Sequence, residues 1–381
     1  MQAQNSDPAF QAWMDGLRQE ALGRGIPAGL LDRVLSGVTP IERVIELDNR
    51  QPEFTQTFWG YLDKRVSETR IAKGREMLAK HGSQLKRIAA RYGVQPRFLV
   101  AFWGMETNYG GYTGKMPVIG SLVTLAYNPR RGAFFREQLL TALELMARGD
   151  LAEDAKGSWA GAIGNVQFIP TTFKAYAVDG DGDGKRDHFG SFADIFASAS
   201  NYLAQSGWDP QRTWGREVRL PKGFDLDLAG LGTKKRIADW QRLGIRRFDG
   251  RDLPAVDIDA SLVMPAGIKG PAFLVYQNFR TIMIWNRSIS YALAVGHLAD
   301  RLVGGGPFLT ARVEERPLSR QNVIEIQRLL TVMGFDPGGV DGIMGSGTRK
   351  AVRAFQRSSG RPADGHADIS LLAALRAKAG G

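Results

Sequence analysis

A single glutamate at the end of an apolar run is the first residue in this sequence that is placed to do chemistry. Residues 97–105 are almost all apolar, and Glu106 follows them directly, before a Thr-Asn-Tyr-Gly-Gly-Tyr segment. A helix that is apolar nearly all round is buried, so we expect Glu106 where a helical core opens onto a loop. Desolvation there favours the protonated carboxyl, which a general acid needs. The alternative is a structural glutamate paired with one of the many arginines.

The second carboxylate that most glycosidic-bond-cleaving enzymes use is missing from the neighbourhood of Glu106. No aspartate or glutamate occurs from Thr107 to Arg136, whereas such enzymes usually pair two carboxyl groups about 5–10 Å apart. Further along, residues 157–170 read GSWAGAIGNVQFIP, and small residues let backbone and ligand approach closely. Ser158 and Gln167 offer neutral hydrogen bonds of the kind that bind the acetamido and hydroxyl groups of a sugar. Simple Gly/Ala packing is the alternative.

An acidic loop beginning at residue 179 has the pattern of a cation-binding loop. Its carboxylates and Gly184 match the first half of an EF-hand, but Gly190 stands where the last acid belongs, and Asp194 is the expected substitute. The predicted ligands are Asp179, Asp181, Asp183, Lys185 through its carbonyl, Asp187 and Asp194. We expect a structural Ca²⁺ without a catalytic role. A metal-free Asp/Gly turn is the alternative.

The composition limits the classes of protein to consider. A length of 381 residues is enough for two or three domains. With 50 Lys+Arg against 39 Asp+Glu, the net charge of +11 favours an anionic partner such as nucleic acid, an anionic membrane surface or an acidic polysaccharide. The absence of cysteine excludes disulfides, thiolate metal sites and cysteine nucleophiles. No apolar run approaches the roughly 18 residues of a membrane-spanning helix, so we expect no transmembrane segment.

The elements that must position these residues are mostly helical. Apolar spacing predicts helices over 7–80 and over 82–108, with a break at 92–96. From about 214 to 285 the pattern changes to short apolar segments between polar ones. Two of these segments, 273–276 and 280–285, predict a hairpin around Gln277-Asn278. A further helix is expected near 288–302.

The last part of the chain reads as a separate module. Glycines and a proline at 303–307, followed by a polar stretch to 317, indicate a linker. Beyond it, residues 318–378 carry three apolar stripes that predict three short helices. Ser319, Thr348 and Asp368 are their predicted N-caps.

Four segments together resemble one known family. Residues 106–110, 127–131 (Tyr-Asn-Pro-Arg-Arg), 158–170 and 286–295 are similar, in this order, to the lytic murein transglycosylase B family, over about residues 10–302. The tail, through Asp341-Gly342, Gly345, Thr348 and Phe355-Gln356, resembles a peptidoglycan-binding domain over 318–378.

The resemblance implies a fold and a reaction. The fold is mainly α (α+β): a catalytic region over 5–306 with a helical N-terminal part, a lysozyme-like core at about 82–302 and a small mixed or β insertion, then a linker (307–317) and a three-helix module. The reaction is non-hydrolytic cleavage of the MurNAc-(β1,4)-GlcNAc bond of peptidoglycan, which leaves 1,6-anhydro-MurNAc ends, with Glu106 as single acid/base and no catalytic cofactor. The residues that the likeness places around the sugar are Ser158, Gln167, Asn286, Tyr202, Tyr291, Arg130 and Arg131.

Both likenesses point to glycan strands of peptidoglycan as the partner, in the periplasm, with the chain acting as a monomer. Met1–Asp7 reads as a start placed on a terminus left by a removed export signal or a clipped lipoprotein cysteine, and an ordinary cytosolic start is the alternative. Partners in wall synthesis are conceivable for such a family, and none is identified. Three alternatives remain: a hydrolysing muramidase, a wall-binding protein without turnover, and a nucleic-acid-binding protein. The last rests on charge alone, because no recognised motif supports it, and we expect no nucleic-acid partner.

Overall fold

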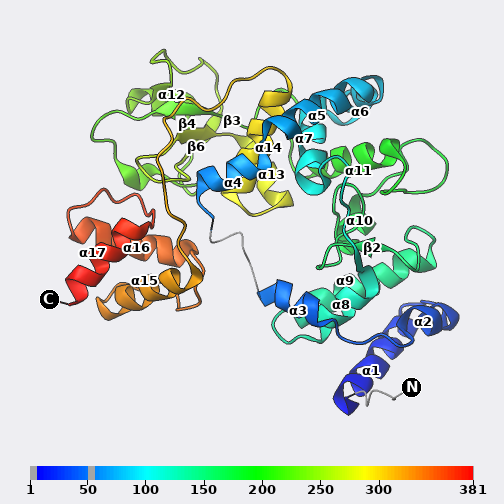
Figure 1. Cartoon of the computed structure of the whole chain (residues 1–381). Helices are drawn as coiled ribbons and strands as arrows, with labels where there is room; N and C mark the ends of the chain where they lie inside the picture. The colour runs from blue at the N-terminus through cyan, green and yellow to red at the C-terminus, as the bar shows by residue number, and fades with distance from the viewer. Residues whose placement is uncertain (1–6, 50–55, 381) are drawn as a thin grey trace. The chain divides into compact units, whose positions relative to one another are not determined.

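The computed structural model of the chain describes residues 7–49 and 56–380. They belong to two units, Met1–Gln51 with Glu76–Gln205 and Pro52–Arg75 with Ser206–Gly381. The division falls within helix α5 (Glu68–Lys80). Helices dominate both units and the strands are short, so the predicted mainly α class is confirmed (Figure 1). The predicted start of the catalytic region at residue 5 and the interpretation of residues 1–6 lie outside the described residues.

The first unit is built from helices around one short strand pair. Its helices are α1 (Pro8–Gly23), α2 (Ala28–Leu35), α3 (Glu42–Asn49), α6 (Gly82–Tyr92), α7 (Pro96–Thr107), α8 (Val118–Tyr127), α9 (Gly132–Ala147), α10 (Pro170–Tyr176) and α11 (Phe192–Gln205). Strands β1 (Met116–Pro117) and β2 (Lys156–Gly157) pair antiparallel, with Met116 opposite Gly157. This pairing brings the two ends of the α8–α9 hairpin together.

The break between α6 and α7 follows the predicted pattern. Gly93 ends α6 in the left-handed conformation (φ 75°), and its N–H donates to Ala89 O. Pro96 is the first residue of α7, where its fixed φ suits a helix start and its missing N–H costs nothing. The predicted helices over 82–108 are therefore confirmed.

The second unit combines helices with an antiparallel sheet. The strands are β3 (Gly215–Arg219), β4 (Lys235–Arg236), β5 (Arg246–Arg247), β6 (Asp259–Val263) and β7 (Ala272–Val275), in the order β4-β6-β7-β3-β5. The helices before the module are α4 (Phe58–Arg65), the 3₁₀ turn η2 (Leu226–Leu228), α12 (Ile237–Arg242), α13 (Gln277–Trp285) and α14 (Ile289–Leu302). Leu262 of β6 lies opposite Leu274 of β7, and both are buried.

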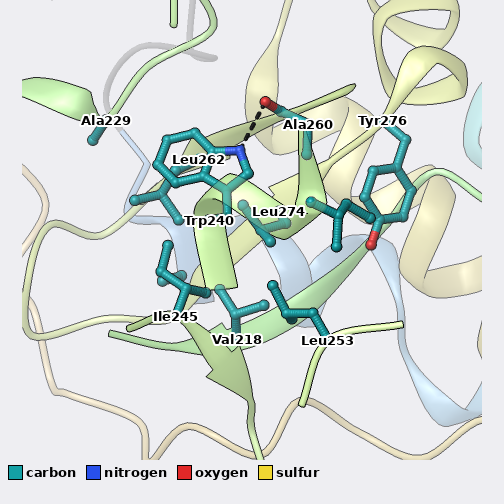
Figure 2. Close-up of a cluster of buried hydrophobic side chains, with 11 residues drawn as sticks. Val218, Ala229, Trp240, Ile245, Leu253, Ala260, Leu262, Leu274 and Tyr276 are labelled. Carbon is teal, nitrogen blue, oxygen red and sulfur yellow. Dashed lines mark hydrogen bonds between the residues drawn. The ribbon is translucent and has the colours of Figure 1, made fainter. Parts of the chain in front are cut away.

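One face of this sheet packs on a core centred on Trp240. Its ring lies among Val218, Ile245, Leu262 and Leu274, and its indole N–H donates to Ala260 O at 3.0 Å (Figure 2). A buried Trp needs such a partner for its N–H. The mixed insertion expected over this part of the chain thus has its own hydrophobic core.

The predicted hairpin over 273–285 is wrong. Strand β7 ends at Val275, and α13 begins at Gln277; the partners of β7 are β3 and β6. Phe279 and Ile282 are fully buried at a spacing of one helical turn. The Asn278 side chain, which we read as turn chemistry, is also buried and donates to Asp209 O and Arg212 O. The helical period was hidden because β7 and α13 form one apolar run.

The C-terminal module has the three predicted helices, α15 (Arg320–Val332), α16 (Ser346–Ser358) and α17 (Ile369–Ala379). Ser319 and Asp368 are the N-caps of α15 and α17, as predicted. The prediction for Thr348 is wrong, because α16 begins two residues earlier with Gly345 as its N-cap. Thr348 is buried instead, and its hydroxyl accepts from Gln327 Nε2 at 3.1 Å. The three helices meet around residues Ile326, Leu330, Val352, Phe355, Leu372 and Leu375.

The segment predicted as a linker makes specific contacts within the second unit. Leu309 and Thr310 donate their backbone N–H groups to the Glu217 carboxylate at 2.7 and 2.8 Å. Phe308 stacks on His297 of α14, with ring centroids 3.8 Å apart. Within the part of the chain that the structure describes, every helix is too short or too polar to cross a bilayer.

Candidate active site

Glu106 lies on the last turn of α7, at the edge of the helical core. The helix is buried along almost its whole length, with Phe98, Phe102 and Trp103 at most 1% exposed, while Glu106 is half-buried. The helix ends at Asn108, which is left-handed (φ 52°), and Tyr109 follows in the same conformation (φ 61°). The sharp turn carries the chain away just after the carboxylate and leaves it at the core's edge, as predicted.

The turn after Glu106 needs the glycine in the middle of α7. A Cβ at Gly104 would lie 2.6–2.7 Å from the ring and hydroxyl of Tyr109, closer than real contacts allow. Tyr109 itself is 5% exposed and packs edge-on against Trp103, with ring centroids 5.6 Å apart. Gly104 thus lets Tyr109 fold back over the helix, which fixes the turn beside Glu106.

The Gly/Ala-rich segment 157–170 forms a tight set of turns in the same unit. The backbone N–H of Ser158 donates to Ala162 O at 2.8 Å, and Ile163 pairs with Phe168 in an isolated bridge. The Ser158 hydroxyl oxygen accepts from the N–H groups of Ala160 and Ala162 at 3.2 and 3.0 Å. With its lone pairs used in this way, the hydroxyl proton is the part that a ligand can use.

Gln167 is held in the opposite sense. Its Nε2 donates to Thr113 O at 2.9 Å and to Gly164 O at 3.0 Å, and its backbone is left-handed (φ 51°). With both amide protons committed, Oε1 is the atom that remains as an acceptor for a ligand N–H or O–H. Ser158 and Gln167 therefore supply a donor and an acceptor, as reading a sugar's hydroxyl and acetamido groups requires.

A cavity of about 620 Å³ in this unit adjoins the same turns. Thr113 and Gly114 line it from the Gln167 side, Lys156 comes from β2, and Asp187 with Phe189 come from the acidic loop. The size is that of a ligand site. Thr113, whose carbonyl accepts from Gln167, and the acidic loop therefore border one hollow surface.

Asn165 connects the segments, although the sequence analysis assigned it no role. It is 5% exposed, and its Oδ1 accepts from Trp103 Nε1 at 2.8 Å while its backbone O accepts from Thr107 Oγ1 at 2.8 Å. Its Nδ2 donates to the carbonyls of His188 and Phe189. An asparagine inside an apolar stretch of small residues was the available signal, because a buried amide must find partners.

Tyr202 lies in the first unit, and two other predicted residues lie in the second. Tyr202 of α11 packs against Tyr176 and Phe168, with ring centroids 4.5 and 5.6 Å apart, and burial raises the pKa of its hydroxyl. Asn286 is the C-cap of α13. Tyr291, 4% exposed, is in the first turn of α14, which Ser288 caps. A place for Asn286 and Tyr291 around Glu106 stays a prediction.

Arg130 and Arg131 share a partner that sequence reasoning missed. Both guanidinium groups donate to the carboxylate of Asp48, which is 2% exposed, and Arg130 also donates to Asp48 O at 2.9 Å. Burial acts to raise the pKa of Asp48, but the hydrogen bonds from both arginines outweigh it and hold the pKa below its usual value. The pair therefore ties α3 to the α8–α9 turn, and its predicted role toward saccharide would fall to the remaining N–H groups.

The acidic loop brings together three of the predicted cation ligands. Oxygen atoms of Asp179, Asp181 and Asp194 all lie within 4.8 Å of one another. Asp183 and Asp187 lie outside this cluster and accept backbone N–H groups inside the loop, from Lys185 and from Phe189 and Gly190. No interaction of the Lys185 carbonyl supports its predicted role among the described residues.

Asp194 is the electrostatic centre of this cluster. It is 1% exposed, and burial raises its pKa, with Asp181 and Asp179 adding repulsion, against backbone hydrogen bonds from Gly180 and Asp187 that lower it. Three carboxylates within reach of one another, one of them buried, suit a hard cation such as Ca²⁺. The residues present therefore fit the predicted ion.

Comparison with known proteins identifies the family. The family model "Transglycosylase SLT domain" matches residues 9–300, and a peptidoglycan binding domain model matches residues 319–375. Membrane-bound lytic murein transglycosylase B of Escherichia coli strain K12 is 29% identical over 319 residues, which cover 77% of this chain and 82% of that protein.

Solved structures extend the comparison. SltB3 from Pseudomonas aeruginosa, in complex with NAG-anhNAM-pentapeptide, is 50% identical, with 96% of this chain and 99% of that chain covered and a TM-score of 0.93. The Escherichia coli lytic transglycosylase Slt35, in complex with calcium, is 29% identical over 78% of this chain and 93% of that chain, with a TM-score of 0.66. The chain therefore belongs to the transglycosylase SLT domain family and is a lytic transglycosylase that carries a C-terminal peptidoglycan-binding domain.

Proposed function

We propose that this enzyme cleaves the MurNAc-(β1,4)-GlcNAc bond of peptidoglycan without water and leaves 1,6-anhydro-MurNAc ends, with Glu106 as its single acid/base. The observation that carries the proposal is the place of Glu106 at the edge of the core, in one unit with the donor Ser158 and the acceptor Gln167. The relative SltB3, crystallised with an anhNAM-containing ligand, supports the anhydro product.

The proposed reaction balances without a second carboxylate. Protonated Glu106 gives its proton to the glycosidic oxygen as the C1–O bond breaks. The C6 hydroxyl oxygen of the same muramic residue then bonds to C1, and its proton returns to the Glu106 carboxylate. No water is consumed, so a water-activating base is unnecessary. Proton transfer by a placed side chain is typically worth about 10²–10⁴-fold in rate, and electrostatic stabilisation and positioning supply the remainder.

Most of the acidic residues that follow Glu106 in the sequence are engaged in ion pairs. Between Thr107 and Lys156 the acidic residues are Glu137, Glu144, Asp150, Glu153 and Asp154. All of them except Asp154 form ion pairs with arginine or lysine side chains within the first unit. A carboxylate held in an ion pair is a poor base for water, because its partner stabilises the charged form.

The product identifies the reaction. Sacculi are digested in water labelled with heavy oxygen, and the released muropeptides are analysed by mass spectrometry. We expect anhydro ends that are lighter than the hydrated sugar by one water and carry no label. Labelled, hydrated muramic ends would instead establish a hydrolysing muramidase, and the absence of any digestion would leave a wall-binding protein.

The acid/base assignment has a matched pair of variants. Glu106→Gln keeps the shape of the side chain but removes the acidic proton. We therefore expect turnover to fall about 10²–10⁴-fold. Glu153→Gln makes the same chemical change at an exposed ion pair with Arg33. Exposed ion pairs contribute little to stability, so we expect the activity of this variant to stay at the parent level. An active Glu106→Gln variant would overturn the assignment.

We also propose that Asp179, Asp181 and Asp194 hold a structural Ca²⁺, which the calcium complex of Slt35 supports. When bound, the ion would neutralise the carboxylates that repel one another around Asp194. Calcium is expected to raise the melting temperature of the parent protein and to leave the Asp194→Asn variant unchanged. Asp154→Asn, at an exposed carboxylate outside the cluster, is the control that keeps the calcium response. A parent protein that does not respond to calcium would contradict the site.

The remaining parts of the proposal concern the setting of the enzyme. We retain a catalytic region over 5–306, a linker over 307–317 and a wall-binding module over 318–378. We propose that the enzyme acts in the periplasm, because its substrate and its module's ligand are both peptidoglycan. We also propose that it acts as a monomer. Sedimentation of the chain with sacculi tests the wall binding, and its sedimentation coefficient without them tests the monomer.

A further inference from the structure

Asn165 occupies an unusual position between the catalytic helix and the acidic loop. It lies two residues before Gln167 and is 5% exposed, and both ends of its amide are engaged by protein groups. Its two Nδ2 protons go to His188 O at 3.2 Å and Phe189 O at 3.0 Å, and Oδ1 accepts from Trp103 Nε1 at 2.8 Å. Any effect on chemistry must therefore pass through these partners.

On the helix side, Asn165 holds the turn of α7 that carries Glu106. Trp103 precedes Glu106 by three residues and Thr107 follows it directly. The Trp103 indole donates to Oδ1 of Asn165, and the Thr107 hydroxyl donates to the Asn165 carbonyl at 2.8 Å. The same Thr107 oxygen accepts from the N–H of Gly110 at 3.0 Å, which closes the turn after the helix. Glu106 is thus flanked by two groups that are bonded to one asparagine.

On the loop side, Asn165 holds the end of the acidic loop. Its backbone N–H also donates to His188 O, at 2.8 Å, so three hydrogen bonds reach the consecutive carbonyls of His188 and Phe189. The residue before His188 donates its N–H to Asp194 Oδ2 at 2.7 Å. The contact is close, since a Cβ at Gly164 would lie 2.6 Å from His188 O. A change around Asp194 is therefore two hydrogen bonds away from Asn165.

We propose that Asn165 is a positioning residue that transmits the conformation of the acidic loop to the carboxylate of Glu106. The inference rests on the proposed acid/base role of Glu106. The conformation of the loop determines the positions of the His188 and Phe189 carbonyls, and Asn165 shifts with them because it is hydrogen-bonded to both. Its bonds from the Trp103 indole and the Thr107 hydroxyl then shift the end of α7. Misplacement of a reacting group by about 1 Å costs on the order of 10²-fold in rate, so a small shift at this asparagine matters.

Two substitutions break the connection on one side each. Asn165→Asp keeps the acceptor for the indole and loses the donors to the loop carbonyls, whereas Trp103→Phe keeps an aromatic ring and loses the indole donor. We expect each to lower kcat on soluble muropeptides about 10–100-fold with KM changed less than about twofold, because the substrate-contacting groups remain. The double variant is expected to lose much less than the product of the two factors, since both break one connection.

The matched control is a substitution at Ser198, which holds the other end of the same loop. Ser198 is fully buried on α11, and its Oγ accepts from Val178 N–H at 2.9 Å, just before Asp179. Ser198→Ala removes a buried hydrogen bond of the loop without touching α7. We expect a loss of stability similar to that of Asn165→Asp, with kcat within about twofold of the parent. Equal losses of kcat in both variants would mean that Asn165 is merely structural.

A second measurement does not depend on activity. The indole N–H resonance of Trp103, identified by its loss in Trp103→Phe, reports the hydrogen bond to Asn165. Asp194→Asn disturbs the loop, and we expect it to shift this resonance in the parent background but not when Asn165→Asp is also present. A resonance that ignores Asp194→Asn in the parent background, or an Asn165→Asp variant with the parent kcat while Glu106→Gln is inactive, would overturn the inference. An active Glu106→Gln variant would instead remove the proposed function.

Discussion

The active-site turns and the C-terminal module both fasten loops with buried amide side chains, but the loops differ. In the module, Gln327 accepts from the N–H of Gly342 and Gln356 accepts from that of Gly365, both at 2.8 Å, so one device occurs twice. Each glutamine holds the Asp-Gly loop that follows its own helix. Asn165 instead joins segments 62 and 23 residues away along the chain. Each of these two loops is fastened by a glutamine of the preceding helix, whereas the active-site turns are fastened by an asparagine that joins more distant segments.

The backbone follows the same division. Among the described residues, the non-glycine residues with positive φ are Asn108, Tyr109 and Gln167, and all of them lie in the active-site segments. The left-handed residues of the module are all glycines. A left-handed non-glycine residue costs roughly 1–2 kcal/mol and persists only where its surroundings over-determine it. The strain therefore lies where the proposed chemistry is, and the module avoids it.

The largest expected effect tests whether the module is independent of catalysis. Phe355 is 1% exposed at the centre of the three helices, and Phe355→Ala should destabilise the module by about 3–5 kcal/mol. This loss is most of the free energy of unfolding that a domain of this size has. We expect binding to sacculi to be lost while turnover of soluble muropeptides stays within about twofold. Val332→Ala, at a side chain that is 80% exposed, is the control, and a parallel loss of soluble turnover in Phe355→Ala would end the division.

The next effect sets Gln167 against Gln327, one glutamine from each region. Gln167→Gly removes the ligand acceptor but relieves the left-handed strain, so we expect kcat to fall about 10²-fold, or roughly 2.7 kcal/mol. The free energy of unfolding should change by less than about 1 kcal/mol. Gln327→Ala should do the reverse: it leaves buried partners unsatisfied, costs about 2 kcal/mol, and spares soluble turnover. Urea unfolding and muropeptide kinetics on both variants separate the two behaviours.

The sequence alone predicts the parts of the molecule that depend on local contacts. The module was predicted helix by helix, because its caps and apolar stripes are local signals. The helices at 82–92 and 96–107 and the place of Glu106 were also predicted, since Gly93, Pro96 and the apolar run mark them. Within the module, the N-cap of the second helix was predicted wrongly, because a buried threonine bonded to Gln327 looks like a cap in the sequence.

What the sequence did not predict depends on contacts between distant segments. Nothing near Arg130 indicates that its partner is Asp48, 82 residues earlier, and nothing near Asn165 indicates the Trp103 indole. Gln167 was predicted to bind the sugar, but its left-handed backbone was not predicted, because the glycines around it indicate close approach and no particular φ. The α13 helix was hidden for a related reason, because strand β7 and this helix form one apolar run whose partners lie elsewhere. Local patterns specify elements, and the active site is made by pairs that no local pattern contains.

A pH-dependent effect of intermediate size concerns how the module is attached. His297 is 5% exposed beneath Phe308, and burial, with nearby Arg301, lowers its pKa to about 3. The unfolded histidine binds a proton below about pH 6.5, whereas the folded one does not until about pH 3. Protons therefore favour the unfolded state, and stability that is complete above about pH 6.5 is lost as the pH falls, by about 2 kcal/mol at pH 5.

Unfolding in urea from pH 7 to pH 4.5 measures this effect. His297→Leu fills the same site without a titrating group. We therefore expect the free energy of unfolding of the variant to fall less steeply as the pH falls, and the two slopes against pH should differ by the amount that corresponds to close to one bound proton. The variant starts lower at pH 7, because the ring contact with Phe308 is lost, and the two curves approach each other in acid. Parallel curves would show that His297 is not the group responsible.

The smallest effect compares two helices that begin in the same way. Ser319 caps α15 of the module by accepting from Asn322 N–H at 3.1 Å, and Ser288 caps α14 by accepting from Tyr291 N–H at 3.2 Å. Replacing either serine with alanine should cost about 1 kcal/mol, measured by urea unfolding. Only Ser288→Ala is expected to lower kcat, by a fewfold, because the first turn that it loosens carries Tyr291, a residue predicted to lie near the sugar.

This pair of variants is informative because the change in stability is the same on both sides. If the module is independent of the active site, Ser319→Ala lowers stability and leaves turnover of soluble muropeptides unchanged. Ser288→Ala lowers stability by the same amount and also lowers kcat. Equal kcat values in the two variants would show that Tyr291 does not need a rigid first turn, and would remove it from the predicted sugar-binding groups. A loss of kcat in Ser319→Ala would mean instead that the module's own order reaches the active site, and the contrast between a local module and a long-range active site would fail there.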